Sequence, residues 1–208
     1  MTGFDQLYFE NVTKAVEQVE TRTSAELVVA VYPQSGQYRD ADYLSGVLFA
    51  LGWLLFAVFN PWFVHPAQAI PFEAAVLFGL GVLTSAHVPQ LRLCLTTKRR
   101  RDRQVRDAAA SMFVVDGVGN TRERTGVLLY MSRLERQLEV IADIGIVDTI
   151  PPEDWSECLF ALHNVGTADD PAEALLVGID RLGDLLATTL PAGEDNPDEI
   201  PNQPRVSP

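Results

Sequence analysis

The chain has 208 residues, of which 47% are hydrophobic, and its formal net charge at pH 7 is −12. The charge is uneven: residues 1–139 contain 14 acidic and 14 basic residues, whereas residues 140–208 contain 14 acidic and 2 basic residues. An acidic surface repels the phosphates of DNA and RNA, so we expect no nucleic acid partner. The two cysteines, Cys94 and Cys158, are too few and too far apart to form a disulfide framework or a metal-binding motif.

The first 40 residues predict a helix followed by a strand. Apolar residues recur at steps of three and four between Phe4 and Thr21, which is typical of an amphipathic helix. The run Glu26–Tyr32 is short and rich in valine, as in a buried strand. Residues 1–10 lack the basic start and the apolar core of a signal peptide, so we expect this segment to remain in the cytoplasm.

The residues from Tyr43 to Leu91 form a long apolar stretch with a single formal charge, Glu73. Two segments within it, Tyr43–Phe59 and Phe72–Val88, approach the roughly 20 residues that a helix needs to cross a bilayer. The segment between them contains three prolines, which would break a helix, and aromatic residues that suit a membrane interface. This pattern predicts a two-helix transmembrane hairpin; the alternative is a buried helical hairpin in a soluble protein.

Basic residues predict the orientation of this hairpin. Six lie between Lys98 and Arg106, just after the second apolar segment, and the segment between the two helices has none. Because basic residues favour the cytoplasmic side, we expect an integral membrane protein with two spans and both termini in the cytoplasm, as in the inner membrane of a bacterium. Besides the bilayer itself, we expect anionic lipid headgroups as partners near Lys98–Arg106.

The remaining chain predicts a small mixed sheet with helices. The predicted elements are a helix over Leu91–Phe113, strands over Gly126–Met131 and Gln137–Ile146, a short helix from Pro151 and a longer helix over Pro171–Leu190. A helical crossover favours parallel pairing of the first two strands, and the short turn at 132–136 favours an antiparallel hairpin. We therefore predict a discontinuous α/β domain (1–40 and 98–190), a hairpin insertion (43–91) and a disordered acidic tail (191–208).

Two segments of the sequence resemble TPM domains. Residues 23–29 (TSAELVV) are similar to the opening strand motif of this family, and residues 121–132 (TRERTGVLLYMS) are similar to its central motif. The resemblance continues through residues 133–136, residues 140–146 and Trp155, and it covers roughly 5–33 and 105–190. It implies a TPM-like sandwich with a small mixed sheet flanked by helices, here interrupted by the transmembrane hairpin.

The resemblance also implies possible functions. Members of the family are mostly membrane-associated, some are linked to photosystem repair or receptor assembly, and acid phosphatase activity and calcium binding are ascribed to parts of it. Ca²⁺ is therefore a candidate cofactor only through the resemblance, and the residues themselves indicate no cofactor. This sequence departs from typical members because its apolar segments lie inside the domain rather than at its C-terminus.

Three charged residues at predicted strand ends are the candidate binding residues. Glu26 begins the first strand, Arg124 precedes the second, and Asp143 lies near the end of the third. If these ends converge, the three side chains would form a charged cleft, in which Asp143 is the best single candidate for a metal ligand. The alternative is an ion pair or a turn cap that stabilises the fold. No catalytic residue is assigned.

Other short motifs are expected to be coincidental or structural. Cys94 and Arg100 match the Cys-x5-Arg spacing of cysteine phosphatases, but the loop has no glycine to cradle a phosphate. Asp40-Ala-Asp42 resembles a phosphotransfer motif, but it does not follow a strand. The histidines are distant in sequence: His65, His87 and His163. We also expect Trp155 and the apolar face of Ala174–Leu186 to close the core over the sheet.

These features predict a membrane-anchored TPM-domain protein that acts as a non-enzymatic interaction, assembly or quality-control module with an unidentified membrane protein partner. The alternative is a metal-dependent, acid phosphatase-like hydrolase. A cluster of three or more carboxylates around one cavity would favour the hydrolase, and scattered acidic residues on a closed surface would favour the interaction module.

Overall fold

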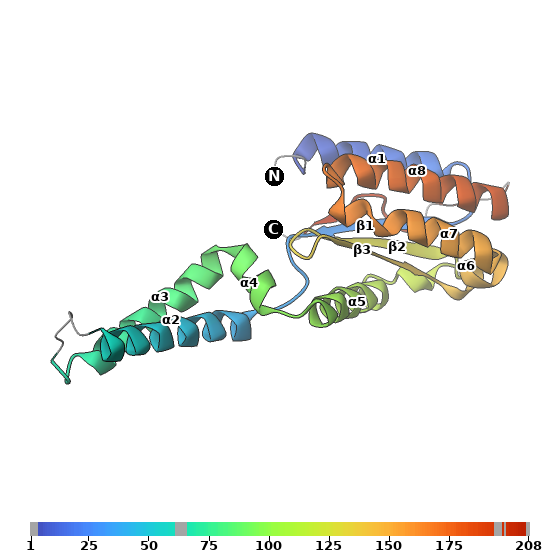
Figure 1. Ribbon diagram of the computed structural model, residues 1–208. Helices are drawn as coiled ribbons and strands as arrows, with labels where there is room; N and C mark the ends of the chain where they lie inside the picture. Colours follow the sequence, from blue (N-terminus) through green and yellow to red (C-terminus); the bar gives the residue numbers. More distant parts are fainter. Residues whose placement is uncertain (1–3, 61–65, 194–196, 198, 207–208) are drawn as a thin grey trace. The chain divides into compact units, whose positions relative to one another are not determined.

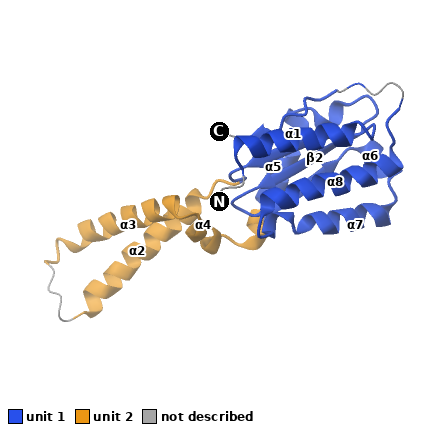
Figure 2. Cartoon of the chain, turned by 90° about the horizontal axis from the view of Figure 1, so that it is seen from above, with its two compact units in different colours: residues 1–35, 102–208 blue, residues 36–101 orange. Residues whose placement is uncertain are grey.

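The computed structural model describes residues 4–60, 66–193, 197 and 199–206 (Figure 1). The chain divides into two compact units: unit 1 comprises Met1–Ser35 and Asp102–Pro208, and unit 2 comprises Gly36–Arg101 (Figure 2). The elements are, in chain order, α1 (Gln6–Glu20), β1 (Glu26–Tyr32), α2 (Arg39–Phe59), α3 (Ile70–His87), α4 (Pro89–Leu95), α5 (Lys98–Val115), η1 (Val118–Asn120), β2 (Gly126–Ser132), β3 (Gln137–Ala142), α6 (Ile144–Thr149), α7 (Pro152–His163), η2 (Val165–Thr167), α8 (Pro171–Thr189) and β4 (Arg205–Val206).

Unit 1 is an α/β domain built on a four-stranded mixed sheet with the strand order β3-β2-β1-β4. β1 pairs in parallel with β2, with Glu26 opposite Gly126 and Tyr32 opposite Ser132. β2 pairs antiparallel with β3, so both predicted pairings are confirmed. The short strand β4 adds a parallel neighbour on the other side of β1.

Both faces of the sheet are covered by helices, which explains why β1 and β2 read as continuous apolar runs. Leu27, Val29 and Val31 point into a core shared with α1, α7 and α8, whereas Val28 and Ala30 point into a second core shared with α5. Side chains of β2 alternate in the same way. Figure 1 shows these two layers, with α1, α7 and α8 on one face and α5 on the other.

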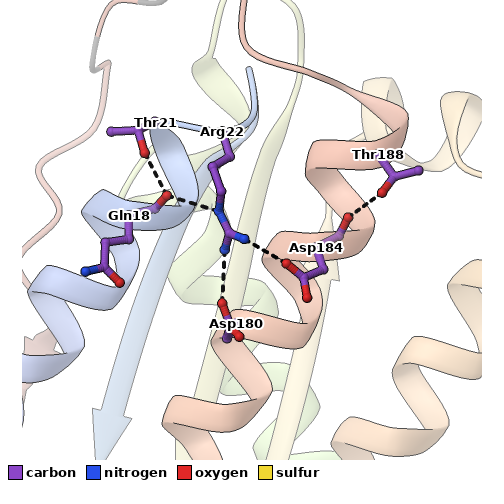
Figure 3. Close-up of polar contacts among 6 residues, drawn as sticks. All are labelled: Gln18, Thr21, Arg22, Asp180, Asp184 and Thr188. Carbon is purple, nitrogen blue, oxygen red and sulfur yellow. Dashed lines mark hydrogen bonds and ion pairs between the residues drawn. The ribbon is translucent and has the colours of Figure 1, made fainter.

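A group of polar contacts around Arg22 connects the end of α1 to α8 (Figure 3). The guanidinium donates to Asp184 Oδ1 at 2.7 Å and to Asp180 Oδ1 at 3.0 Å, and its Nε–H donates to the Gln18 carbonyl at 3.3 Å. The first and last helices of the domain are thus joined at the end of α1, where the Gln18 carbonyl also accepts a hydrogen bond from Thr21 Oγ1 at 2.8 Å. Arg22, Asp180 and Asp184 are all exposed, so their ion pairs position the two helices more than they stabilise the fold.

Three predictions about element ends differ from the structure. The third strand ends at Ala142 rather than Ile146, because Asp143 begins a new helix, α6. The helix predicted over Leu91–Phe113 is two helices, α4 and α5, separated at Thr96 where the backbone is extended. The tail predicted to be disordered instead returns to the sheet within its described residues, through buried Ile200 and through β4.

Unit 2 is a hairpin in which α2 packs against α3. The two helices approach closely at Gly46 and Gly81, since a Cβ at Gly81 would lie 2.8 Å from the Gly46 Cα atom. At one end of the hairpin Asp42 accepts hydrogen bonds from Ser85 Oγ (2.8 Å) and from Arg92 (2.9 Å from each of two nitrogens). The predicted proline-rich turn lies partly outside the described residues, at 61–65.

Both hairpin helices are long and apolar enough to cross a membrane. Only 17% of the most apolar 18-residue window of α2 is buried in the structure, and the corresponding share for α3 is 11%. Large apolar side chains such as Leu48, Leu55 and Phe72 face outward. The hairpin therefore presents an apolar outer surface, unlike the core helices of unit 1.

Candidate functional site

The turn that precedes β2 places Arg124, one of the three predicted site residues. The Thr125 backbone N–H donates to Thr121 Oγ1 at 2.9 Å, and the Arg124 N–H donates to the Thr121 carbonyl at 3.2 Å. Arg124 has φ 59°, in the left-handed region that few residues other than glycine adopt. The two hydrogen bonds to Thr121 hold the turn in this strained conformation. The Arg124 side chain reaches Asp143 at the start of α6.

Arg124 and Asp143 form a bidentate ion pair. Nε–H donates to Oδ2 at 2.7 Å and an Nη2–H donates to Oδ1 at 2.8 Å, while the Ile144 backbone N–H also donates to Oδ1 at 2.7 Å. The Asp143 side chain is only 5% exposed, whereas that of Arg124 is 58% exposed. Burial alone would raise the pKa of Asp143, but hydrogen bonds from Arg124 and Ile144 and the charge of Arg124 lower it overall.

Asp143 also determines where β3 stops. As the N-cap of α6 it accepts from Ile144 N–H, and its own N–H donates to the Gly126 carbonyl at 2.9 Å. The Gly145 N–H donates to the Arg124 carbonyl at 3.0 Å, which joins the start of α6 to the turn before β2. The pair thus links three elements, and this favours the alternative left open by the sequence, an ion pair and cap that stabilise the fold.

Glu26 occupies the head of β1 beside the same edge of the sheet. Its backbone N–H donates to the Thr125 carbonyl at 3.2 Å, and its buried carboxylate accepts from the Ile200 N–H at 3.2 Å. The structure therefore brings Arg124 and Asp143 into direct contact and gives Glu26 a role in holding the C-terminal tail. The three strand ends converge in the backbone, since Glu26 lies opposite Gly126 and the Asp143 N–H donates to the Gly126 carbonyl.

The tail supplies residues that the sequence reasoning did not find. Glu199 accepts from the Arg122 backbone N–H at 3.0 Å, and its other oxygen lies 3.6 Å from Arg122 Nε. Arg205 of β4 pairs with Asp116 at 3.3 Å. A strand of two residues and one buried isoleucine carry no periodic pattern, so no signal in the sequence distinguished this segment from a disordered tail.

The arrangement limits what Asp143 can bind. Its carboxylate oxygens accept three hydrogen bonds, one at Oδ2 and two at Oδ1, so a metal ion would compete with the Arg124 guanidinium for this carboxylate. Among the described residues, no group of three or more His, Cys, Asp or Glu side chains lies close enough together to hold a metal ion. The geometry therefore supports a structural pair more directly than a metal centre.

The structure also shows where the cysteine, aspartate and histidine residues of the other short motifs lie. Cys94 is exposed on α4, while Arg100 pairs with Asp40, so these two motif members serve different contacts. Asp42 pairs with Arg92 within unit 2. The His87 ring Nδ1 lies 2.8 Å from the Leu83 carbonyl of its own helix. His163 lies in the last turn of α7, and His65 lies outside the described residues.

A hollow of about 350 Å³ at the carboxyl ends of β1 and β2 was not anticipated. Tyr32 and Tyr130 stack there with their ring centroids 5.5 Å apart, and the Tyr130 hydroxyl lies 3.1 Å from Ser35 Oγ. Burial raises the pKa of the Tyr130 hydroxyl. The two tyrosines are 98 residues apart in sequence, and only the parallel pairing of β1 and β2 brings them together.

Comparison with known proteins bears on the fold. No protein-family model matches the chain, and no curated protein matches it. The NMR structure of the BA42 protein from the psychrophilic bacterium Bizionia argentinensis is similar, with a TM-score of 0.60 and 17% sequence identity, over 98% of this chain and 95% of that chain. At this identity the likeness shows the fold alone: this chain has a BA42-like α/β fold.

Proposed function

We propose that the protein is a membrane-anchored TPM-like domain protein that acts as a non-enzymatic interaction, assembly or quality-control module. The observation that carries the proposal is the outward apolar surface of the α2–α3 hairpin, most of which is exposed in the structure. Contiguous apolar surface of this extent is unstable in water and is typical of membrane or protein contact. A bilayer would cover it, whereas a core helix of a soluble protein is covered by the protein itself.

The charges that flank the hairpin support a cytoplasmic position for unit 1. Lys98, Arg99, Arg103 and Arg106 are exposed, so they are available to the headgroups of anionic lipids. The hairpin is inserted between β1 and β2, so residues on both of its sides would lie on one side of the membrane. Positive-inside reasoning then places both termini in the cytoplasm.

The non-enzymatic part of the proposal rests on the candidate site. Arg124 and Asp143 are engaged with each other and with the backbone of β2 and α6, which is the arrangement of a structural pair. Enzymatic phosphoryl transfer needs a positioned nucleophile together with clustered cations or a metal ion at the phosphate. We assign the exposed cations of residues 98–106 to lipid headgroups instead, because they follow the hairpin directly in the sequence.

Membrane anchoring is tested by alkaline carbonate extraction of cell membranes and by reporter fusions at each end of the chain. We expect the protein to remain in the membrane pellet and both reporters to be cytoplasmic. Release by carbonate, or a terminus outside the cytoplasm, would refute the anchoring.

A phosphatase assay tests the enzymatic alternative. The purified protein is incubated with a generic phosphomonoester, with and without Ca²⁺, Mg²⁺ or Mn²⁺, beside the Asp143→Asn variant. We expect no turnover above background. Metal-dependent turnover that the substitution abolishes would establish the hydrolase and place Asp143 in the site.

A further inference from the structure

Unit 1 has a second hollow, formed by α7, η2 and α8. Gly178 allows α7 and α8 to approach, since a Cβ at this position would lie 2.8 Å from Leu162 Cδ2. The two helices pack side by side (Figures 1 and 2) and leave an open groove of about 510 Å³. Its apolar lining includes Val177, which is 63% exposed, and Ala161 and Ala174, which are partly exposed, whereas Leu162 and Val165 beneath them are buried in the main core.

One end of the groove is acidic. Asp169 and Glu173 are both exposed there, and Asp170 beside them caps α8 by accepting from the Ala172 and Glu173 N–H groups. The cation in the lining, Arg181, lies 3.7 Å from Glu157 and is partly neutralised by it. Within the lining, the three acidic residues Asp169, Asp170 and Glu173 outnumber the basic residue Arg181. The field at this surface attracts cations.

We propose that the α7–α8 groove is a docking site for a cationic amphipathic helix of a partner protein. Apolar side chains spaced at i, i+3 or i+4, and i+7 would contact Val177, Ala174 and Ala161, and a Lys or Arg side chain at one end would face Asp169 and Glu173. The proposal rests on the proposed interaction function and names the chemistry of the partner. Cytoplasmic segments next to membrane spans are rich in Lys and Arg, so a membrane-anchored module meets such helices at the bilayer surface.

The basic helix α5 exposes Val114 and Val115 at its C-terminal end, away from its basic residues, so it is not an amphipathic helix with a free apolar side along its basic part. Val105, Ala109 and Met112 of α5 are buried in the second core of their own sheet. The open form of the groove also suits a helix more than a small molecule, which is usually enclosed on most sides. Charge complementarity therefore points to a helix from a different protein.

The test measures binding of a fluorescent 18-residue helical peptide, with Leu on one face and Lys on the other, to the full chain in nonionic detergent. Fluorescence anisotropy is compared for the wild type, Val177→Ser and the double variant Asp169→Asn/Glu173→Gln. Removing one apolar contact or the two charges should weaken binding by about tenfold each. A photo-crosslinker on the peptide should label residues between 161 and 181.

Matched controls change similar residues outside the groove. Val114→Ser replaces an exposed valine on α5, and Glu153→Gln/Asp154→Asn neutralises two acidic residues in the first turn of α7. Both should bind the peptide as the wild type does. All substituted positions are exposed, so melting temperatures should be unchanged.

Several results would overturn the proposal. These are equal binding by groove and control variants, crosslinks on another face, or equal binding of a peptide in which Glu replaces Lys. A change of oligomeric state in Val177→Ser without peptide, measured by light scattering, would show that the groove binds a second copy instead. Carbonate extraction does not depend on the groove, so failure of the docking site and failure of membrane anchoring are distinguishable.

Discussion

Asp143 has two separable roles, as partner of Arg124 and as N-cap of α6. Asparagine caps helices about as well as aspartate, whereas alanine does not. We therefore expect Asp143→Ala to lower the free energy of unfolding by about 1–2 kcal/mol and Asp143→Asn by about 0.5 kcal/mol, the modest value of a pair whose cation is largely exposed. Chemical denaturation of both variants measures this order. Equal losses would show that the cap contributes nothing.

The ion pair also predicts a pH dependence. The folded pKa of Asp143 is lowered because the hydrogen bonds and charge that favour the carboxylate outweigh its burial. A group of this kind stabilises the fold above its unfolded pKa of about 3.9, and the contribution is lost as the pH falls through the folded value. The difference in stability between the wild type and Asp143→Asn should thus be full at pH 7 and shrink below about pH 4. A difference that stays constant down to pH 3 would contradict the lowered pKa.

Gly126 is required by close approach of the backbone. A Cβ at this position would overlap the carbonyl oxygen of Val118, which belongs to η1 and has little freedom to move. We expect Gly126→Ala to cost at least about 2 kcal/mol, because the start of β2 or the η1 turn must shift. Gly193→Ala is the control, since a Cβ there meets no atom within 4 Å. Similar melting temperatures for both variants would contradict this reading.

At the level of elements, periodicity predicted those that bury continuous faces. The valine-rich run gave β1 the bounds Glu26–Tyr32, and the crossover argument predicted its parallel partner. The ends of elements depended instead on single contacts that sequence patterns do not show. β3 ends where Asp143 caps a new helix, and the tail is held by the hydrogen bond from its Ile200 N–H to the Glu26 carboxylate. The sequence left open both a charged cleft and a structural ion pair at these strand ends, and the Arg124–Asp143 pair is seen only in the structure.

Trp155 lies on α7 and is partly buried against the main core, so it closes the core less completely than expected. A fully buried tryptophan replaced by alanine typically costs about 3–5 kcal/mol, and for a partly buried one we expect about 2 kcal/mol. Phe160→Ala on the same helix is the control, because Phe160 is 75% exposed and should change stability by less than about 0.5 kcal/mol. Denaturant titration of the two variants compares them, and equal effects would show that Trp155 does not support the core.

At the scale of the molecule, the two units differ in what they need from their surroundings. The two apolar cores on either face of the sheet consist entirely of residues from unit 1. Unit 2 has its own polar contacts, Asp42 with Ser85 and Arg92, and exposes its apolar residues. Among the described residues, the two apolar cores therefore contain no side chain of unit 2, although the hairpin occupies the crossover between β1 and β2.

This separation predicts that the hairpin can be replaced. A chain in which a flexible Gly/Ser linker substitutes for Gly36–Arg101 keeps every residue of both cores and all four strands. Because the entropy of loop closure changes only slowly with loop length, the parallel pairing of β1 with β2 should survive. We expect this variant to be monomeric in water without detergent and to unfold cooperatively, as seen by circular dichroism and light scattering. The full chain, handled identically, is the control and should aggregate unless detergent covers its apolar helices. A linker variant that aggregates or lacks a cooperative transition would show that the hairpin contributes to folding of the domain, and not only to its attachment.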